Sequence, residues 1–211
     1  MTLSAKINLT RESASATFHL ELNFSIPSDG ITALFGSSGS GKTTLLRCIA
    51  GLEENAVATI QFKHDLWQSH DYFLPTHQRR IGLVFQRQNL FPHLSGKQNI
   101  EFAEKRVKPA LDKFNVGSVI DKLEIEHLLN KYPAQMSGGE QQLVALARTL
   151  KSNPAFLLMD EPLSSLDGSR KNRLLEIIKD LNTKHGLPIL YVTHSVDEVL
   201  KIADHLLVIE D

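Results

Sequence analysis

Residues 31–44 read ITALFGSSGSGKTT, and this stretch decides the fold class. The short apolar run 31–35 is typical of a strand that is buried on both faces. A loop rich in Gly and Ser follows, and then a predicted helix from about Thr43 to Ala50, which Gly51 ends. Residues 36–43 match the pattern G-x-x-x-x-G-K-[ST] in full, in the strand–loop–helix context that this pattern requires.

This pattern has a physical basis in phosphate binding. Glycines permit backbone conformations in which successive N–H groups point at one anion, and the start of a helix adds its positive end. Lys42 would place a charge on the β- and γ-phosphates, and the Thr43 hydroxyl could ligate Mg²⁺. The loop alone leaves open whether the chain is a kinase, a GTPase or a motor ATPase. The residues expected to bind nucleotide here are Gly36, Ser37, Ser38, Gly39, Ser40, Gly41, Lys42, Thr43 and Thr44.

The rest of the chain surrounds this loop with strands and helices. Apolar residues alternate with polar ones over Phe18–Ile26, which predicts a half-buried strand, and residues 86–150 are mostly helical in pattern. Strands alternating with helices in the last third predict parallel β-α-β units. Further strands are expected at 57–62, 81–85, 156–159, 189–192 and 206–209, and helices at 121–132, 139–150, 170–184 and 196–203. The fold class is therefore α/β with a helical insert.

The composition of the 211 residues is that of an ordinary globular protein, with 42% hydrophobic and 22% charged residues. This excludes collagen-like, disordered and disulfide-stapled classes, and the single Cys cannot form an internal bridge. A net charge of −1 provides no overall field for nucleic acid or an anionic membrane. No apolar run approaches the length of a signal peptide or a membrane-spanning helix, so we expect any connection to a membrane to run through a partner.

Polar side chains follow three of the predicted strands. Asp160 and Glu161 end the apolar run 156–159, His194 follows 189–192, and Gln86 follows 81–85. The carboxyl ends of parallel strands are where open α/β folds bind ligands. Asp160 suits a Mg²⁺ shell, and Glu161 suits a general base that polarises water. The two acids could instead merely cap the strand before Pro162, and a lone His or Gln is more often structural.

A second candidate anion site lies at residues 136–140, which read MSGGE and begin a helix. Ser137 can cap that helix, and the paired glycines let a phosphate approach its N-terminus. At this point the chain resembles the ATP-binding cassette (ABC) family, whose signature is LSGGQ. The resemblance covers nearly the whole chain and its motifs occur in the family's order. They are the loop 36–43, Gln86, the signature 136–140, the acids 160–161, SSLD at 164–167 and His194.

The resemblance implies a P-loop NTPase of the ABC cassette type, with a mostly parallel core sheet, an N-terminal antiparallel β part and an inserted helical subdomain. It implies a homodimer in which two cassettes pair head to tail, each ATP lying between one subunit's phosphate loop and its partner's signature. By resemblance Lys42, Glu161 and His194 are catalytic, and Asp167 communicates across the interface. Phe18 resembles the aromatic residue that stacks on adenine, although it also belongs to the alternating core-facing set. The residues facing the partner's ATP would be Ser137, Gly138, Gly139 and Glu140, and the metal ligands Thr43, Gln86 and Asp160.

Three positions depart from the family pattern. Met136 and Glu140 replace Leu and Gln of the signature, and Leu143 stands where many importers of the family carry Arg. The first two changes are mild, whereas the third predicts that an interaction near the signature helix is absent. The segments 31–43, NLFPHLS and VTHSVDEV are similar to the ATPase subunit of bacterial molybdate importers. Importers for sulfate, thiamine or iron have segments that resemble these.

The resemblance also implies partners and a place in the cell. We expect one ABC ATP-binding domain over residues 1–211, with a RecA-like core at 1–86 and 151–211 and a helical subdomain at about 87–150. We expect no C-terminal regulatory domain in this chain. The expected partners are permease subunits, which hold the chain at the cytoplasmic face of the membrane, and indirectly a periplasmic or extracellular binding protein. Apolar residues at Leu90, Phe91, Pro92 and Leu94 are candidates for permease contact, or for core.

Three other classes fit the sequence less well. A soluble ABC ATPase that acts on DNA or ribosomes would usually show a long coiled coil, twin cassettes or a basic stripe. A GTPase would need an N-K-x-D motif after a strand, and a small-molecule kinase would leave MSGGE unexplained. The expected function is therefore Mg-ATP hydrolysis that energises uptake of molybdate or a related oxyanion. Nucleic acid is not an expected partner.

Overall fold

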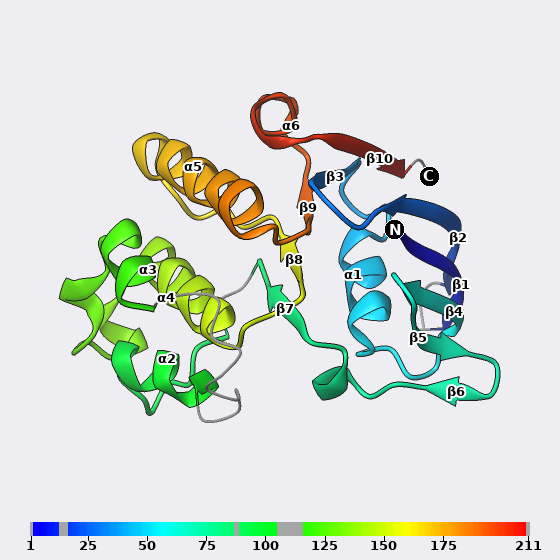
Figure 1. Ribbon diagram of the computed structural model, residues 1–211, viewed down its shortest axis with the longest axis horizontal. Helices are drawn as coiled ribbons and strands as arrows, with labels where there is room; N and C mark the ends of the chain where they lie inside the picture. The colour runs from blue at the N-terminus through cyan, green and yellow to red at the C-terminus, as the bar shows by residue number, and fades with distance from the viewer. Residues whose placement is uncertain (1, 13–16, 87–88, 105–115, 210–211) are drawn as a thin grey trace.

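Two five-stranded sheets carry the fold in the computed structural model, which describes residues 2–12, 17–86, 89–104 and 116–209. One sheet is parallel and the other antiparallel. In Figure 1 the parallel strands lie between the antiparallel part, drawn in blue and teal on the right, and a group of green helices on the left. The observed arrangement confirms the α/β fold class, with an antiparallel β part near the N-terminus.

The parallel sheet has the order β10-β3-β9-β8-β7, and every neighbouring pair within it is parallel. The residues of β8 and β9 are buried throughout, as their continuous apolar sequences predict. Because the strands run the same way, their carboxyl ends meet at one edge. The bounds are Ile31–Gly36 for β3, Ile81–Val84 for β7, Phe156–Asp160 for β8, Ile189–Thr193 for β9 and His205–Ile209 for β10.

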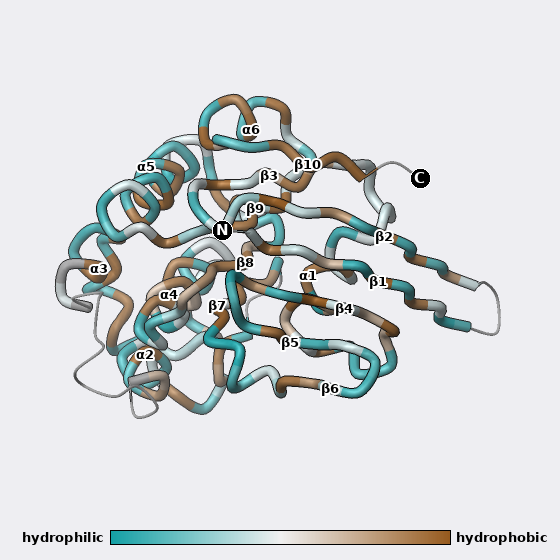
Figure 2. Tube along the Cα trace, turned by 45° about the vertical axis from the view of Figure 1, so that its right-hand side comes forward, coloured by the Kyte–Doolittle hydropathy of each residue, from teal (hydrophilic) through white to brown (hydrophobic). Residues whose placement is uncertain are grey.

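The antiparallel sheet has the order β2-β1-β4-β5-β6. Its longest pair joins β1 (Thr2–Glu12) to β2 (Thr17–Pro27), and Figure 2 shows hydrophobic and hydrophilic residues alternating along both. The alternation predicted for Phe18–Ile26 is confirmed. β1 was not predicted, although its buried Leu3, Ala5, Ile7 and Leu9 recur with the same period of two. The remaining strands are β4 (Val57–Phe62), β5 (Asp65–Ser69) and β6 (Tyr72–Phe73).

Helices cover both faces of the parallel sheet. Phe156, Leu158 and Val192 pack into a core with α1 (Lys42–Ala50) and the antiparallel sheet. The alternate residues, Leu157 and Tyr191 among them, pack into a second core with the later helices. These include α4 (Gly138–Lys151), α5 (Gly168–His185) and α6 (Val196–Ile202). Two-sided burial of this kind holds the sheet edge and its loops on a rigid support.

The helical group between β7 and β8 differs from the prediction in one place. The helix expected over 121–132 is wrong, because α3 (Val116–Leu123) ends before Glu124, whose φ is +52°. A 3₁₀ turn, Glu126–Leu128, follows. The apolar residues that suggested one helix, such as Ile125 and Leu128, are indeed buried, but separate short elements deliver them to the core. The group also contains α2 (Gly96–Glu104) and a second 3₁₀ turn, Pro133–Gln135, while a third, Thr76–Gln78, precedes β7.

Within the described ranges, every helix is too short or too polar to cross a lipid bilayer.

Candidate functional site

The phosphate-loop motif lies between β3, which ends at Gly36, and α1, which begins at Lys42. Gly41 is the N-cap of α1, and its φ of +90° is one that L side chains rarely adopt. The first N–H groups of any helix have no partner within that helix, so the start of α1 presents donors and the positive end of the helix dipole. This is the local structure that a phosphate group requires.

The Lys42 ammonium lies inside this loop. It donates to the carbonyl oxygen of Gly36 at 2.9 Å, to that of Ser37, and to the Ser40 hydroxyl at 3.5 Å. Lys42 is buried, with 6% of its surface exposed. The loop therefore folds around a positive charge that is held by dipoles alone in these contacts, and an anion entering the loop would meet that charge at close range.

Phe18 lies beside the phosphate loop. A Cβ atom on Gly41 would come within 3.2 Å of Phe18 Cζ and 2.8 Å of Leu20 Cδ1, so α1 and β2 approach closely at this point. Phe18 is half-buried and also packs against the core. Its position is compatible with both sequence interpretations, and its contact with adenine remains a prediction.

Thr43 and Asp160 meet at the edge of the sheet. The Thr43 hydroxyl donates to Asp160 Oδ2 at 2.8 Å, across 117 positions of sequence. Asp160 is 4% exposed, and burial raises its pKa above the ordinary value, with a further contribution from the Glu161 charge. A buried carboxylate beside a hydroxyl is a pair of hard oxygen ligands whose charge is poorly compensated. These two residues therefore fit a Mg²⁺ ion held jointly with nucleotide phosphate.

Glu161 lies between Gln86 and His194. Its Oε2 accepts from Gln86 Nε2 at 3.0 Å, and its Oε1 lies 3.1 Å from His194 Nδ1. The Glu161 side chain is 20% exposed and the His194 side chain 66%, so solvent reaches the group. The backbone of Glu161 has a φ of +45°, an uncommon value for a residue with a side chain, and such values cluster at functional sites.

The sequence analysis missed a partly buried group of hydrogen bonds next to His194 in the chain, centred on Glu198. Oε2 of Glu198 accepts from the Tyr191 hydroxyl at 2.9 Å and from the Thr193 hydroxyl at 2.7 Å. Burial, together with the Glu198 charge, raises the pKa of Tyr191. The spacing Ser195-x-x-Glu198 was an available signal, because S-x-x-E is typical of a helix start and α6 begins at Val196.

The signature segment forms the start of α4. Ser137 caps the helix in a reciprocal box, in which its hydroxyl accepts from the Glu140 N–H at 3.3 Å and the Glu140 carboxylate accepts from the Ser137 N–H at 2.7 Å. That second bond is the main cause of a lowered pKa at Glu140. A Cβ on Gly139 would lie 2.7 Å from Leu166 Cδ2, so the segment packs against residues 165–166.

Asp167 follows this contact and caps α5 by accepting from the Arg170 N–H at 3.0 Å. The structure thus brings two groups of predicted residues together separately. The phosphate loop, Asp160, Glu161, Gln86 and His194 share the sheet edge, whereas the signature and Asp167 adjoin one another through residues 165–166. Among the described residues, no cluster of three or more His, Cys, Asp or Glu side chains forms a metal centre by itself.

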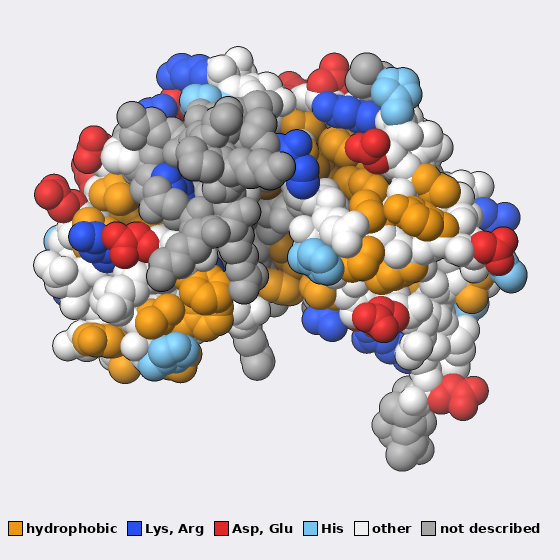
Figure 3. All heavy atoms as spheres, turned by 60° about the horizontal axis from the view of Figure 1, so that its bottom comes forward, with side chains coloured by type: hydrophobic (Ala, Val, Ile, Leu, Met, Phe, Trp, Pro, Cys, Tyr) orange, Lys and Arg blue, Asp and Glu red, His pale blue; other side chains and the backbone are white. Residues whose placement is uncertain are grey.

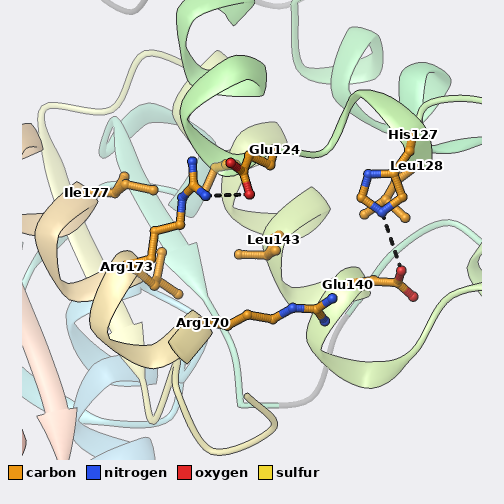
Figure 4. Close-up of a pocket in the computed structure, with 10 residues that line it drawn as sticks. Glu124, His127, Leu128, Glu140, Leu143, Arg170, Arg173 and Ile177 are labelled. Atoms are coloured by element: carbon orange, nitrogen blue, oxygen red, sulfur yellow. Dashed lines mark ion pairs between the residues drawn. The ribbon is translucent and has the colours of Figure 1, made fainter. Parts of the chain in front are cut away.

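Leu143 lines a small pocket of about 90 Å³ between α3, α4 and α5 (Figure 4). It is partly buried and packs against the core, so an apolar contact occupies this position of the signature helix. The charged groups at the pocket come from α4 itself, from α5 and from the segment after α3. Arg173 of α5 pairs with Glu124, and His127 Nε2 lies 3.6 Å from Glu140 Oε1.

Comparison with known proteins gives concordant results. Residues 20–164 match the family described as ABC transporter. The chain is 48% identical over 194 residues to the molybdenum import ATP-binding protein ModC of Thiobacillus denitrificans, covering 92% of this chain and 54% of the relative. It is 47% identical to ModC of Saccharophagus degradans, covering 97% of this chain and 56% of the relative. The chain therefore spans about half the length of the curated relatives it matches.

Solved structures share the fold. The dimeric post-hydrolysis state of the ATP-binding cassette MJ0796, bound to ADP and Pi, superimposes with a TM-score of 0.84 at 27% identity, covering 99% of this chain and 94% of that one. A second dimeric structure of MJ0796, described as a bacterial ABC transporter cassette, gives a TM-score of 0.83 at 26% identity, with 98% and 94% covered. The matched residues include the phosphate loop, the signature and the strand-end acids, and the chain belongs to the ABC transporter family.

Proposed function

We propose that this chain binds and hydrolyses Mg-ATP as the cassette of a bacterial importer, and that the imported solute is molybdate. The observation that carries the ATPase proposal is the Glu161 carboxylate, which is held between Gln86 and His194 at the sheet edge that also holds the phosphate loop. The names of the relatives support molybdate as the solute.

In the proposed reaction each side chain acts at a definite atom. Lys42 and the N–H groups at the start of α1 bind the β- and γ-phosphates. Glu161 accepts a proton from the attacking water, and Gln86 orients the carboxylate. His194, which lies next to the other oxygen of the Glu161 carboxylate, contacts the γ-phosphate. Mg²⁺, when bound by Thr43, Gln86 and Asp160, would neutralise charge that develops on the phosphate oxygens.

We further propose a head-to-tail homodimer. The signature residues begin α4, a different helix from the α1 that follows the phosphate loop, and they pack against residues 165–166. Ser137, Gly138 and Gly139, with Glu140 behind them, would therefore complete the ATP site of the partner rather than their own, and Asp167 would lie at the same interface. The dimeric form of both solved relatives supports this arrangement.

A groove supports the proposed permease contact. It measures about 780 Å³ and lies between β7 and the helices α2 and α4. The Phe91 ring lines this groove and packs on Phe102, with 4.6 Å between the ring centroids. The Arg148 guanidinium carbon lies over the Phe91 ring, 5.2 Å from its centroid. Of the other predicted contact residues, Leu90 packs against the core and Pro92 is exposed. The chain would then be cytoplasmic and peripheral at the membrane, with the binding protein reached through the permease.

The charge distribution supports a protein partner over nucleic acid. On the face drawn in Figure 3, described Lys and Arg side chains are interspersed with Asp and Glu, and hydrophobic side chains gather in patches between them. Nucleic-acid binding would favour a basic stripe.

Replacing Glu161 tests the ATPase proposal. We expect Glu161→Gln to stop steady-state ATP hydrolysis while leaving ATP binding and an ATP-stabilised dimer, because the amide keeps the shape but cannot take a proton. Glu176→Gln, on an exposed position of α5, is the matched control and should hydrolyse ATP at the wild-type rate. Substantial turnover by Glu161→Gln would overturn the assignment.

Mixed dimers test the head-to-tail arrangement. Ser137→Arg blocks the signature of one subunit and Lys42→Ala disables the phosphate loop of the other. A mixture of the two should regain one intact composite site per mixed dimer, and hence measurable hydrolysis that neither variant shows alone. Absence of any rescue would count against the proposed dimer.

Uptake by whole cells tests the solute. A strain that lacks the gene should lose uptake of labelled molybdate at low external concentration and regain it from a plasmid copy, while sulfate, thiamine and iron uptake stay unchanged. Loss of one of those solutes with molybdate uptake intact would assign the cassette to a different importer. Intact uptake of all four would favour an ABC ATPase outside transport.

A further inference from the structure

The Glu198 carboxylate joins the end of β9 to the start of α6, and His194 lies between them. Glu198 Oε2 accepts two hydroxyl hydrogen bonds, from Tyr191 and from Thr193. Tyr191 is fully buried and Thr193 is 3% exposed, so water cannot readily replace the carboxylate as their acceptor. A hydrogen bond to an ionised acceptor is stronger than a neutral one, which makes Glu198 an effective anchor for both side chains.

Thr193 passes this restraint on to the backbone around His194. Its Oγ1 accepts from the Ser195 N–H at 3.0 Å, while Ser195 Oγ accepts from the Glu198 N–H at 3.4 Å. Thr193 and Ser195 are the two chain neighbours of His194. The backbone that carries the imidazole is therefore fixed on both sides by one closed set of hydrogen bonds.

The His194 side chain itself is loosely surrounded. It is 66% exposed, and its Nδ1 lies 3.1 Å from Glu161 Oε1. A hydrogen bond made by an exposed ring depends on where the backbone places the ring, because little packing corrects an error. The imidazole gains its direction from the segment that Glu198 holds.

We propose that Glu198 is a positioning residue for His194, acting through Thr193. The carboxylate fixes the backbone of residues 193–195 so that the imidazole meets Glu161 and the γ-phosphate together. This inference rests on the proposed function, in which Glu161 and His194 act on bound ATP. The Tyr191 hydroxyl donates to the same oxygen, but Tyr191 precedes Thr193 by two residues and is not a chain neighbour of His194, so its bond stabilises the fold without directing His194.

The two hydroxyl donors separate positioning from stability. Thr193→Val and Tyr191→Phe each remove one hydrogen bond to Glu198, and both should lower the melting temperature. We expect Thr193→Val to lower kcat for ATP hydrolysis by about 10- to 100-fold, because small misplacements of a reacting group have effects of this size. Tyr191→Phe should keep kcat within about twofold of wild type. Thr193→Ser retains the hydroxyl and should restore most of the rate.

Glu198→Leu removes the acceptor of both hydroxyl groups and should lower kcat as Thr193→Val does, and the double variant should be no slower than either single one, because both act along one path. The ATP dissociation constant should change little in each case, since the phosphate loop is untouched. Asp197→Asn, exposed in the same turn of α6, is the control.

Several results would overturn the positioning role. These are wild-type kcat in Glu198→Leu, equal loss of kcat in Tyr191→Phe and Thr193→Val, or additive losses in the double variant. A wild-type chain that does not hydrolyse ATP would overturn the proposed function and this inference together. A chain that hydrolyses ATP in a Glu161-dependent way, but whose Glu198→Leu variant is fully active, would overturn the positioning role alone.

Discussion

The Thr43 hydroxyl donates a 2.8 Å hydrogen bond to Asp160 Oδ2, and this bond joins the first turn of α1 to the end of β8. One residue comes from the phosphate loop and the other from the strand-end acids. Two motifs that are far apart in sequence thus form one oxygen-rich corner, next to the Lys42 ammonium that the loop encloses.

From the contact between Thr43 and Asp160 we predict that Asp160→Asn weakens ATP binding only when Mg²⁺ is present. The amide keeps an oxygen but lacks the charge that Mg²⁺ prefers, so affinity for Mg-ATP should fall about 10- to 100-fold. Affinity for ATP in EDTA should change little. Titration calorimetry with and without Mg²⁺ measures both, and Thr43→Ser, which keeps the hydroxyl, is the control. Equal losses with and without the metal would contradict the assignment of Asp160.

The same substitution should raise stability at neutral pH. Burial raises the pKa of Asp160 in the folded chain, so the ionised carboxylate costs folding free energy above that pKa. Asp160→Asn removes this cost, and the gain over wild type should shrink as the pH falls and the wild-type carboxyl is protonated. Urea unfolding between pH 7 and pH 4 measures the difference. A variant that is less stable than wild type at pH 7 would show that the carboxylate is compensated by contacts other than the Thr43 bond.

The lowered pKa of Glu140 should give the free energy of unfolding a pH dependence of the opposite sign. Its bond from the Ser137 N–H lowers its pKa below the ordinary 4.5, so the bond stabilises the fold above that value. The contribution is lost as the pH falls through the folded-state pKa. Glu140→Gln can still accept this bond without titrating, so its stability should fall less between pH 6 and pH 3. Glu176→Gln should follow the wild-type curve. Identical curves for wild type and Glu140→Gln would contradict the cap.

The sequence predicted most strands because their signals are local. Apolar runs that end in polar residues located β8 and β9, and the loop motif located the start of α1. The alternation in β1 carried an equally local signal, but its small Ala5 and many polar neighbours weakened the pattern. The break at Glu124 could not be read from periodicity, because a 3₁₀ turn buries the same apolar residues that a continued helix would bury.

The candidate site was predictable as a set of motifs but not as a set of contacts. Strand-end positions placed Asp160, Glu161 and His194 at one edge, yet no pattern tells that Glu161 lies between Gln86 and His194. Glu198 was missed because its role depends on tertiary contacts, in which the residue from α6 accepts hydrogen bonds from side chains of β9. The charge at Arg79 was missed for the same reason, since buried arginines are rare and depend on the surrounding carbonyls.

Arg79 holds the carboxyl end of α1, opposite to the phosphate loop. Its Nη1 donates to the carbonyl oxygens of Cys48 at 3.1 Å and Ile49 at 2.8 Å, and its Nε donates to Leu74 O at 2.8 Å. A guanidinium at this end interacts favourably with the helix dipole. Arg79 is 2% exposed, and burial lowers its pKa to about 10. Its partners are carbonyl dipoles, a side-chain amide at Gln68 and the ring faces of Trp67 and Phe73.

Replacing Arg79 should therefore destabilise the whole chain. Arg79→Met fills most of the volume but leaves several buried carbonyls without a donor, so the free energy of unfolding should fall by roughly 3 kcal/mol or more. Arg79→Lys keeps the charge but cannot reach carbonyls in three directions, and it should lie between Arg79→Met and wild type. Arg80→Gln, at the exposed neighbouring position, is the control and should change stability by less than about 1 kcal/mol. Guanidinium unfolding of the four chains measures these differences. An Arg79→Met chain as stable as Arg80→Gln would mean that water satisfies the α1 carbonyls and that the guanidinium does not anchor the helix.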